Sequence, residues 1–198
     1  VLLRSANNPA MVACWLAATK AGAVVVNTMP MLRAGELGQI VDRGEIGLAL
    51  CDLRLVAELE AAAAHCPDLK RIVCFNDGGP SSLEAMATAK PDAFENVDTA
   101  AEDPALIAFT SGTTGQPKAA VHFHRDVMAA CACFPKHVLR ADENDVFIGS
   151  PPLAFTFGLG GLVLFPFRLA ATAILPARAR PEALLAAIAR HTAPVCFS

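Results

Sequence analysis

Short apolar runs alternate along this chain with longer stretches in which apolar positions recur every three or four residues. The short runs are typical of buried strands and the longer stretches of helices. The predicted strands include residues 24–26, 46–51, 71–75, 105–109, 119–123, 145–149, 172–175 and 195–198, and the predicted helices include 11–21, 34–43, 125–134, 158–165 and 181–191. Because strands that alternate with helices pair in parallel through crossovers, the pattern predicts a layered α/β domain with parallel sheets and with ligands at the carboxyl ends of its strands.

Several helix boundaries coincide with residues that start or stop helices. Asn8 can act as an N-cap, Pro9 suits a first helical turn, and Gly22 suits a stop. Residues 11–21 are apolar nearly all round, which predicts a helix buried on every side. Asp52 follows the predicted strand at 46–51 and can cap the helix that comes next.

Residues 76–104 differ from the rest in being polar and rich in turn-forming side chains. They begin with a turn cluster at 76–81 and end in an irregular stretch from residue 90. We expect this segment to be a surface excursion that joins two parts of one domain.

The most distinctive stretch is the loop that follows the predicted strand at 105–109. Its hydroxyl and glycine residues are Thr110, Ser111, Gly112, Thr113, Thr114 and Gly115, and Lys118 closes it after a proline. Glycines let the backbone approach an anion closely, successive N–H groups can form an anion-binding nest, and hydroxyls add donors. Since the lysine supplies positive charge, the stretch predicts a phosphate-binding loop.

Two other interpretations of this loop fit less well. A Walker A loop needs four residues between its first glycine and an adjoining Gly-Lys-Ser/Thr. Here only two residues lie between Gly112 and Gly115, and Lys118 follows a proline. A plain turn between two strands would need fewer hydroxyls and no lysine.

The segment Thr110-Ser111-Gly112-Thr113-Thr114-Gly115-Gln116-Pro117-Lys118 resembles the phosphate-loop signature of the adenylate-forming superfamily, which comprises acyl-CoA synthetases, luciferases and the adenylation domains of peptide synthetases. In that family the loop contacts the β- and γ-phosphates of ATP while a carboxylate attacks the α-phosphate. The resemblance implies cofactor binding by the loop and catalytic roles for Thr110 and Lys118. Ala119 departs mildly from the family, which usually has glycine there.

A second segment, residues 150–161, resembles the superfamily signature that walls the acyl pocket. The position aligned with Phe155 is usually histidine or an aromatic residue beside the carboxylate and the α-phosphate. The resemblance implies substrate binding by Phe155, Phe157, Gly158, Leu159 and Gly160. A flat, apolar Phe155 among small residues would suit a planar ring in the pocket, while Phe157 fits a plain core residue equally well.

Together the two segments imply an ATP-dependent acid–CoA ligase that uses ATP, Mg²⁺ and coenzyme A and acts on a small carboxylic acid. The amino-acid sequences of residues 121–126 and 155–160 most resemble those of benzoate and 2-aminobenzoate ligases. We expect residues 1–198 to be an incomplete large N-terminal domain, with 1–100 before the phosphate loop and 101–198 carrying the loop and the start of the acyl pocket. By resemblance, the C-terminal domain and the residues for adenine, ribose and Mg²⁺ lie beyond Ser198.

Two other function classes stay open. The chain could be a nucleotide-binding fragment without catalysis, or an adenylation domain that passes its product to a carrier protein. His122, His124 and Asp126 have the His-x-His-x-Asp spacing that can open a binuclear metal site, but Val127 replaces the histidine that usually follows. We therefore expect no metal site, a helix that begins at His124, and a His122 that packs near the phosphate loop.

Composition and charge exclude further classes. The chain has 16 basic and 19 acidic residues and a net charge of −3, which gives nucleic acid or an anionic membrane no electrostatic attraction. The apolar stretch 158–175 contains a proline and an arginine, so we predict a buried helix and a strand there and no membrane span. Seven cysteines without a Cys-x-x-Cys pair suggest small hydrophobes in a reducing cytoplasm.

Overall fold

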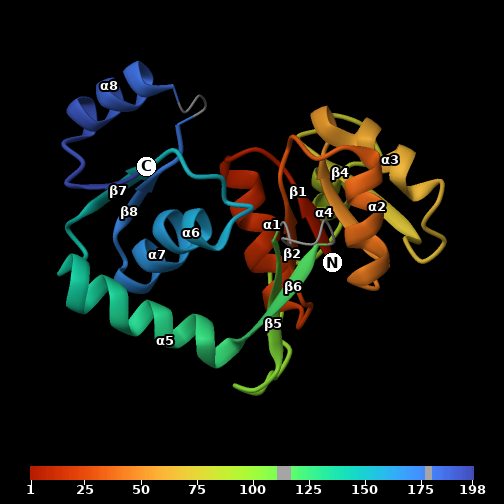
Figure 1. The fold of residues 1–198 in the computed structure, drawn as a ribbon, viewed down its shortest axis with the longest axis horizontal. Coiled ribbons are helices and arrows are strands. Elements are labelled where there is room, and N and C mark those ends of the chain that lie inside the picture. Colours follow the sequence, from red (N-terminus) through yellow and green to blue (C-terminus); the bar gives the residue numbers. More distant parts are fainter. Residues whose placement is uncertain (111–116, 177–179) are drawn as a thin grey trace.

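The computed structural model describes residues 1–110, 117–176 and 180–198, which form two parallel sheets with an antiparallel hairpin between them (Figure 1). The first sheet has the strand order β2-β1-β3-β4 and consists of β1 (Leu2–Arg4), β2 (Val26–Thr28), β3 (Leu48–Asp52) and β4 (Arg71–Phe75). The hairpin pairs β5 (Pro104–Thr110) with β6 (Lys118–Phe123). The second sheet, ordered β8-β7-β9, consists of β7 (Val146–Gly149), β8 (Thr172–Ile174) and β9 (Val195–Phe197). The predicted α/β class with parallel sheets is confirmed.

Helices connect the strands and cover the sheets. They are α1 (Pro9–Lys20), α2 (Ala34–Arg43), α3 (Val56–Ala63), α4 (Leu83–Thr88), α5 (His124–Phe134), α6 (Thr156–Leu159), α7 (Phe165–Leu169) and α8 (Pro181–His191). A 3₁₀ turn (Leu53–Leu55) precedes α3, and π-helical turns follow α5 (Pro135–Leu139) and α6 (Gly160–Leu164). The expected caps are present, since Asn8 Oδ1 accepts from the Met11 N–H at 2.9 Å and Asp52 Oδ1 accepts from the Arg54 N–H at 3.1 Å.

The expectation that the first helix is buried on every side was wrong. α1 buries one face, which carries Met11, Cys14, Trp15 and Ala18, while Leu16 on the other face is 40% exposed. The outward face also carries the exposed Ala13 and Ala17. Alanine is apolar but small, so its exposure to water costs little and an alanine-rich face can look buried in the sequence without being so.

Three other elements differ from the prediction. β2 begins two residues later than expected, because Val25 instead forms a bridge to the hairpin: its N–H donates to the Ala105 carbonyl at 3.0 Å, and its carbonyl accepts from the Ile107 N–H at 2.9 Å. The segment 76–104 contains the short helix α4, which is capped by the buried side chain of Ser82. The helix expected at 158–165 continues as α7 to Leu169.

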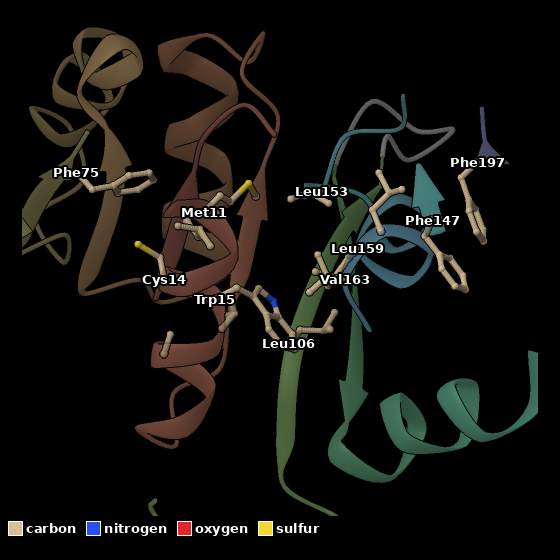
Figure 2. Packing of buried hydrophobic residues seen from close by; sticks show 14 residues of the cluster. Met11, Cys14, Trp15, Phe75, Leu106, Phe147, Leu153, Leu159, Val163 and Phe197 are labelled. Atoms are coloured by element: carbon tan, nitrogen blue, oxygen red, sulfur yellow. The ribbon is translucent and has the colours of Figure 1, made fainter. Parts of the chain in front are cut away.

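Two apolar clusters form most of the core. One lies between the first sheet and helices α2 and α3, and includes Leu2, Val26, Leu37, Val41 and Leu59. The other joins α1 to the hairpin and the second sheet, and Figure 2 shows Trp15 and Leu106 beside Leu159 and Val163 in it. This second cluster fixes the hairpin between the two sheets.

The cysteines fit the prediction in part. Cys14, Cys51, Cys66 and Cys131 are buried, and burial raises the pKa of the Cys14 thiol to about 11 and that of Cys51 to about 12. Cys133 and Cys196 are exposed, so these two do not pack as small hydrophobes in the core. In the parts of the chain that the structure describes, we find no helix with the length and apolar character that crossing a bilayer requires.

Candidate active site

The end of the β5–β6 hairpin brings together two of the predicted site residues, Thr110 and Lys118. They form the last pair of the antiparallel ladder that the described residues contain, and both are exposed. Residues directly opposed in such a ladder send their side chains to the same face, so the Thr110 hydroxyl and the Lys118 ammonium leave the hairpin on one side. Of the ion pairs between described residues, none involves Lys118.

The remaining predicted loop residues lie between these two. Ser111, Gly112, Thr113, Thr114 and Gly115 fall outside the described residues. The exit of the loop is tied to the first layer of helices, because Arg43 of α2 donates from Nη1 to the Pro117 carbonyl at 2.8 Å.

A pocket of about 410 Å³ opens beside this end of the hairpin, at the carboxyl ends of β2 and β5. Its lining comes from β2 and the loop after it, from α2, from both ends of the phosphate loop, and from the segment before α6: Asn27, Thr28, Met29, Met31, Leu32, Glu36, Gln39, Ile40, Phe109, Thr110, Pro117, Ala154 and Phe155. Thr110 and Phe155, which belong to two separate sequence motifs, therefore border one pocket. Parallel strands commonly present ligand sites at this edge.

Phe155 combines a fixed backbone with a side chain that is open to a ligand. It occupies the N-cap position of α6, its N–H donates to the Pro152 carbonyl at 3.0 Å, and its carbonyl accepts from the Leu159 N–H at 2.8 Å. Its side chain remains 48% exposed and lines the pocket. A planar apolar ring held in this way can pack against another flat group.

The other predicted substrate-binding residues lie elsewhere. Leu159 and Gly160 line a separate cavity of about 120 Å³, together with His122. The Phe157 ring packs against Phe197 with centroids 5.3 Å apart. The predicted substrate-binding set is therefore divided among different surfaces.

Gly158 has a packing role that explains its residue type. It is buried, and a Cβ atom placed there would overlap the Pro152 carbonyl oxygen. That oxygen already accepts the hydrogen bond from Phe155, so it is not free to move away. Gly158 thus allows the close approach that sets the turn carrying Phe155.

The His-x-His-x-Asp stretch serves the start of α5. His124 begins the helix as expected, and Asp126 Oδ2 accepts from the Phe123 N–H at 2.9 Å, which caps it. His122 pairs with Leu106 at the end of β6 away from Lys118, so it lies farther from the phosphate loop than we expected. Within the described ranges, no group of three or more His, Cys, Asp and Glu side chains could hold a metal ion.

Sequence reasoning missed the pocket residues at the end of β2 and just after it, among them Asn27, Thr28, Met29 and Met31. The predicted strand ended at residue 26, and no element or role was predicted for the residues between it and the helix at 34–43. The rule that ligands bind at the carboxyl ends of strands would have pointed to them if the strand had been placed correctly.

The wall formed by residues 29–32 is held by a buried cation. Arg4 of β1 is 1% exposed, and within the described residues its guanidinium donates to four backbone carbonyls: those of Met29 (2.7 Å), Pro30 (3.0 Å), Leu32 (3.0 Å) and Leu55 (3.2 Å). Burial lowers the pKa of Arg4, but an arginine remains protonated at neutral pH. By binding these carbonyls, the Arg4 side chain fixes the shape of one pocket wall.

A second buried charge joins the ends of three strands. The Asp52 side chain is 0% exposed and receives two hydrogen bonds from the Arg54 guanidinium, at 2.8 and 2.6 Å, besides the one from the Arg54 N–H. Asn76 donates to it at 2.8 Å and Ser5 at 3.4 Å. The hydrogen bonds from Arg54, and after them the one from Asn76, lower the pKa of the Asp52 carboxyl to about 2. The carboxylate is thus satisfied within the fold and has a structural role.

Comparison with known proteins agrees with this geometry. The model of the AMP-binding enzyme family matches residues 1–198, so the chain belongs to that family. Benzoate–CoA ligase of Thauera aromatica is 27% identical over 152 residues, which are 77% of this chain and 29% of the ligase. A medium/long-chain-fatty-acid–CoA ligase of Mycobacterium tuberculosis is 33% identical over 158 residues, which are 77% of this chain and 25% of that protein.

Among solved structures, the anthranilate CoA ligase AuaEII in complex with anthranoyl-AMP superposes with a TM-score of 0.91 at 26% identity. The superposition covers 100% of this chain and 38% of that one. The chain therefore spans roughly a third of the length of its relatives.

Proposed function

We propose that this chain is part of the large N-terminal domain of an ATP-dependent acid–CoA ligase whose acid is an aryl acid such as benzoate or 2-aminobenzoate. The observation that carries the proposal is that Thr110 and Phe155 border one pocket beside the Thr110–Lys118 pair. A phosphate-binding group and an aromatic wall are what an enzyme needs to join a nucleotide to an aryl acid. Membership of the AMP-binding enzyme family supports the reaction type.

The first step would activate the acid. A carboxylate is a poor electrophile, and its attack on the α-phosphate of ATP gives an acyl-adenylate and pyrophosphate. The residues present suit the nucleotide, because a hydroxyl and an ammonium leave the same side of the hairpin at the loop mouth. Lys118 and Thr110 would stabilise the negative charge that develops on the departing pyrophosphate. Mg²⁺ would neutralise part of that charge, and we assign no described side chain to it.

The second step would transfer the acyl group. The thiol of coenzyme A attacks the acyl carbonyl, AMP leaves, and a thioester forms. Phe155 would pack on the ring of the acid, and Phe109, Met29 and Met31 add apolar surface to the same pocket.

The choice of an aryl acid rests on Phe155 and on the relatives that act on ring acids. The fatty-acid–CoA ligase among the relatives shows that the family alone does not decide the acid. The decisive experiment compares acyl-CoA formation from benzoate, 2-aminobenzoate, hexanoate and acetate by the complete polypeptide that carries this chain. We expect benzoate or 2-aminobenzoate to be preferred, and faster turnover of acetate or hexanoate than of benzoate would contradict the proposal.

Variants of two phenylalanines sharpen this test. Phe155→Leu removes the flat ring from the pocket, and we expect it to lower kcat/KM for benzoate about tenfold while changing that for hexanoate little. Phe94→Leu is the matched control, because Phe94 is exposed and lies outside the pocket lining. Equal losses in both variants would show that Phe155 does not select the acid.

A further inference from the structure

We propose that Asn7 and Asn27 form a clamp that positions the backbone ahead of Phe155 and so governs which acids the site accepts. This inference rests on the proposed function. It concerns residues that neither signature segment contains, and we call the pair the asparagine clamp.

The first half of the clamp comes from the loop after β1. Asn7 Nδ2 donates to the Pro151 carbonyl at 2.8 Å, and Asn7 Oδ1 accepts from the Leu153 N–H at 2.8 Å. A single amide thus uses both of its polar ends on one short backbone segment. The partners lie 144 and 146 residues away in the sequence, so the contact joins the loop after β1 to the segment before α6.

The second half comes from β2. Asn27 Nδ2 donates to the Leu153 carbonyl at 3.2 Å, so both backbone polar groups of Leu153 are bound by asparagines, one from the loop after β1 and one from β2. Asn27 Oδ1 is buried and has no donor among the described residues. The hydrogen bond to Leu153 therefore fixes the orientation of this amide, and Asn27 also lines the pocket.

The Leu153 side chain provides a third anchor. It is 1% exposed and belongs to the core cluster shown in Figure 2. With the backbone bound on both sides and the side chain buried, residues 151–153 have little freedom to shift relative to β1 and β2.

The clamped segment leads directly into the turn that carries Phe155. The Phe155 N–H donates to the Pro152 carbonyl, which lies between the two clamped residues. A shift of residues 151–153 would therefore move the Phe155 ring relative to Thr110 across the pocket. Misplacement of a reacting group by about 1 Å can cost on the order of 100-fold in rate. Asn7 and Asn27 act through Phe155 and are positioning residues.

Two variants weaken the clamp in different ways. Asn7→Asp keeps the acceptor for the Leu153 N–H but places a carboxylate oxygen against the Pro151 carbonyl. Asn27→Leu keeps the branched shape and the number of side-chain heavy atoms, removes the donor to Leu153, and also removes the unpartnered oxygen. Asn96→Asp is the control, because this substitution makes the same chemical change as Asn7→Asp at a residue that is exposed.

The readout is the ratio of kcat/KM for benzoate to that for hexanoate, measured with the complete polypeptide beside its thermal stability. We expect Asn7→Asp and Asn27→Leu to lower this ratio about fivefold or more, and Asn96→Asp to leave it unchanged. A merely structural role would lower stability and both kcat/KM values together, so an unchanged ratio in both variants would overturn the inference. An unmodified enzyme that activates no acid would instead overturn the proposed function, and the inference with it.

Discussion

Thr110 and Lys118 lie directly opposite each other in the β5–β6 hairpin, as the last cross-strand pair among the described residues. The hairpin itself is fixed from two sides, since Val25 bonds to Ala105 and Ile107 of β5, and Arg43 bonds to the Pro117 carbonyl. The two groups that would meet the phosphates thus stand on a rigid base, which is how an enzyme obtains electrostatic stabilisation without reorganising at the moment of reaction.

Replacement of Lys118 tests this role. We expect Lys118→Ala to lower kcat for acid-dependent pyrophosphate release on the order of 100-fold or more, because one preorganised positive group is lost at the site of developing charge. The control is Lys136→Ala, which removes an exposed lysine after α5. Equal activity of the Lys118 variant and the control would remove Lys118 from the mechanism.

We expect residues 1–198 alone to have no acid–CoA ligase activity. The chain spans only about a third of the length of its relatives, so most of what such a protein contains is missing from these 198 residues. We expect purified residues 1–198 to form no acyl-CoA from benzoate, ATP and coenzyme A, with the complete polypeptide as the positive control. ATP-dependent acyl-CoA formation by residues 1–198 would refute this expectation.

Arg4 should be among the most sensitive positions for stability. Arg4→Met leaves the carbonyls of residues 29, 30, 32 and 55 without their donor inside the fold, and each unsatisfied buried group costs about 1–3 kcal/mol. We expect the free energy of unfolding, measured with urea, to fall by about 3 kcal/mol or more. Arg190→Met at the exposed end of α8 should change it by less than about 0.5 kcal/mol. A loss of similar size in both variants would contradict the account of the pocket wall.

Asp52 should make stability depend on pH in the acid range. Its pKa in the folded chain is about 2, below the value of about 3.9 in an unfolded chain. Its contribution is therefore fully present above about pH 4 and is lost as the pH falls toward 2. We expect the difference in unfolding free energy between the unmodified chain and Asp52→Asn to shrink between pH 5 and pH 2. A pH-independent difference would contradict the assignment, and Asp92→Asn at an exposed position serves as the control.

The elements that were predicted correctly are those set by neighbours in the sequence. α2 and α8 have the predicted bounds, and Asn8 caps α1 as expected. Local signals such as caps, prolines and apolar spacing act within a few residues, so they can be read before the fold is known.

What the sequence could not reveal depends on distant partners. Val25 and Val26 have the same residue type, yet Val25 bonds to the hairpin and Val26 to β1. The contact between Asn7 and Leu153 spans 146 residues, and the wall at residues 29–32 owes its shape to Arg4. The motifs predicted which residue types meet at the site, but the pocket that unites Thr110 with Phe155 required the fold.

The measurement that tests the central claim most directly is acid-dependent ATP–pyrophosphate exchange by the complete polypeptide. An enzyme that forms an acyl-adenylate exchanges labelled pyrophosphate into ATP only when its acid is present, and it does so without coenzyme A. We predict exchange with benzoate or 2-aminobenzoate that disappears in the Lys118→Ala variant. Absence of exchange with every acid tested, or ATP cleavage to ADP and phosphate, would contradict the account.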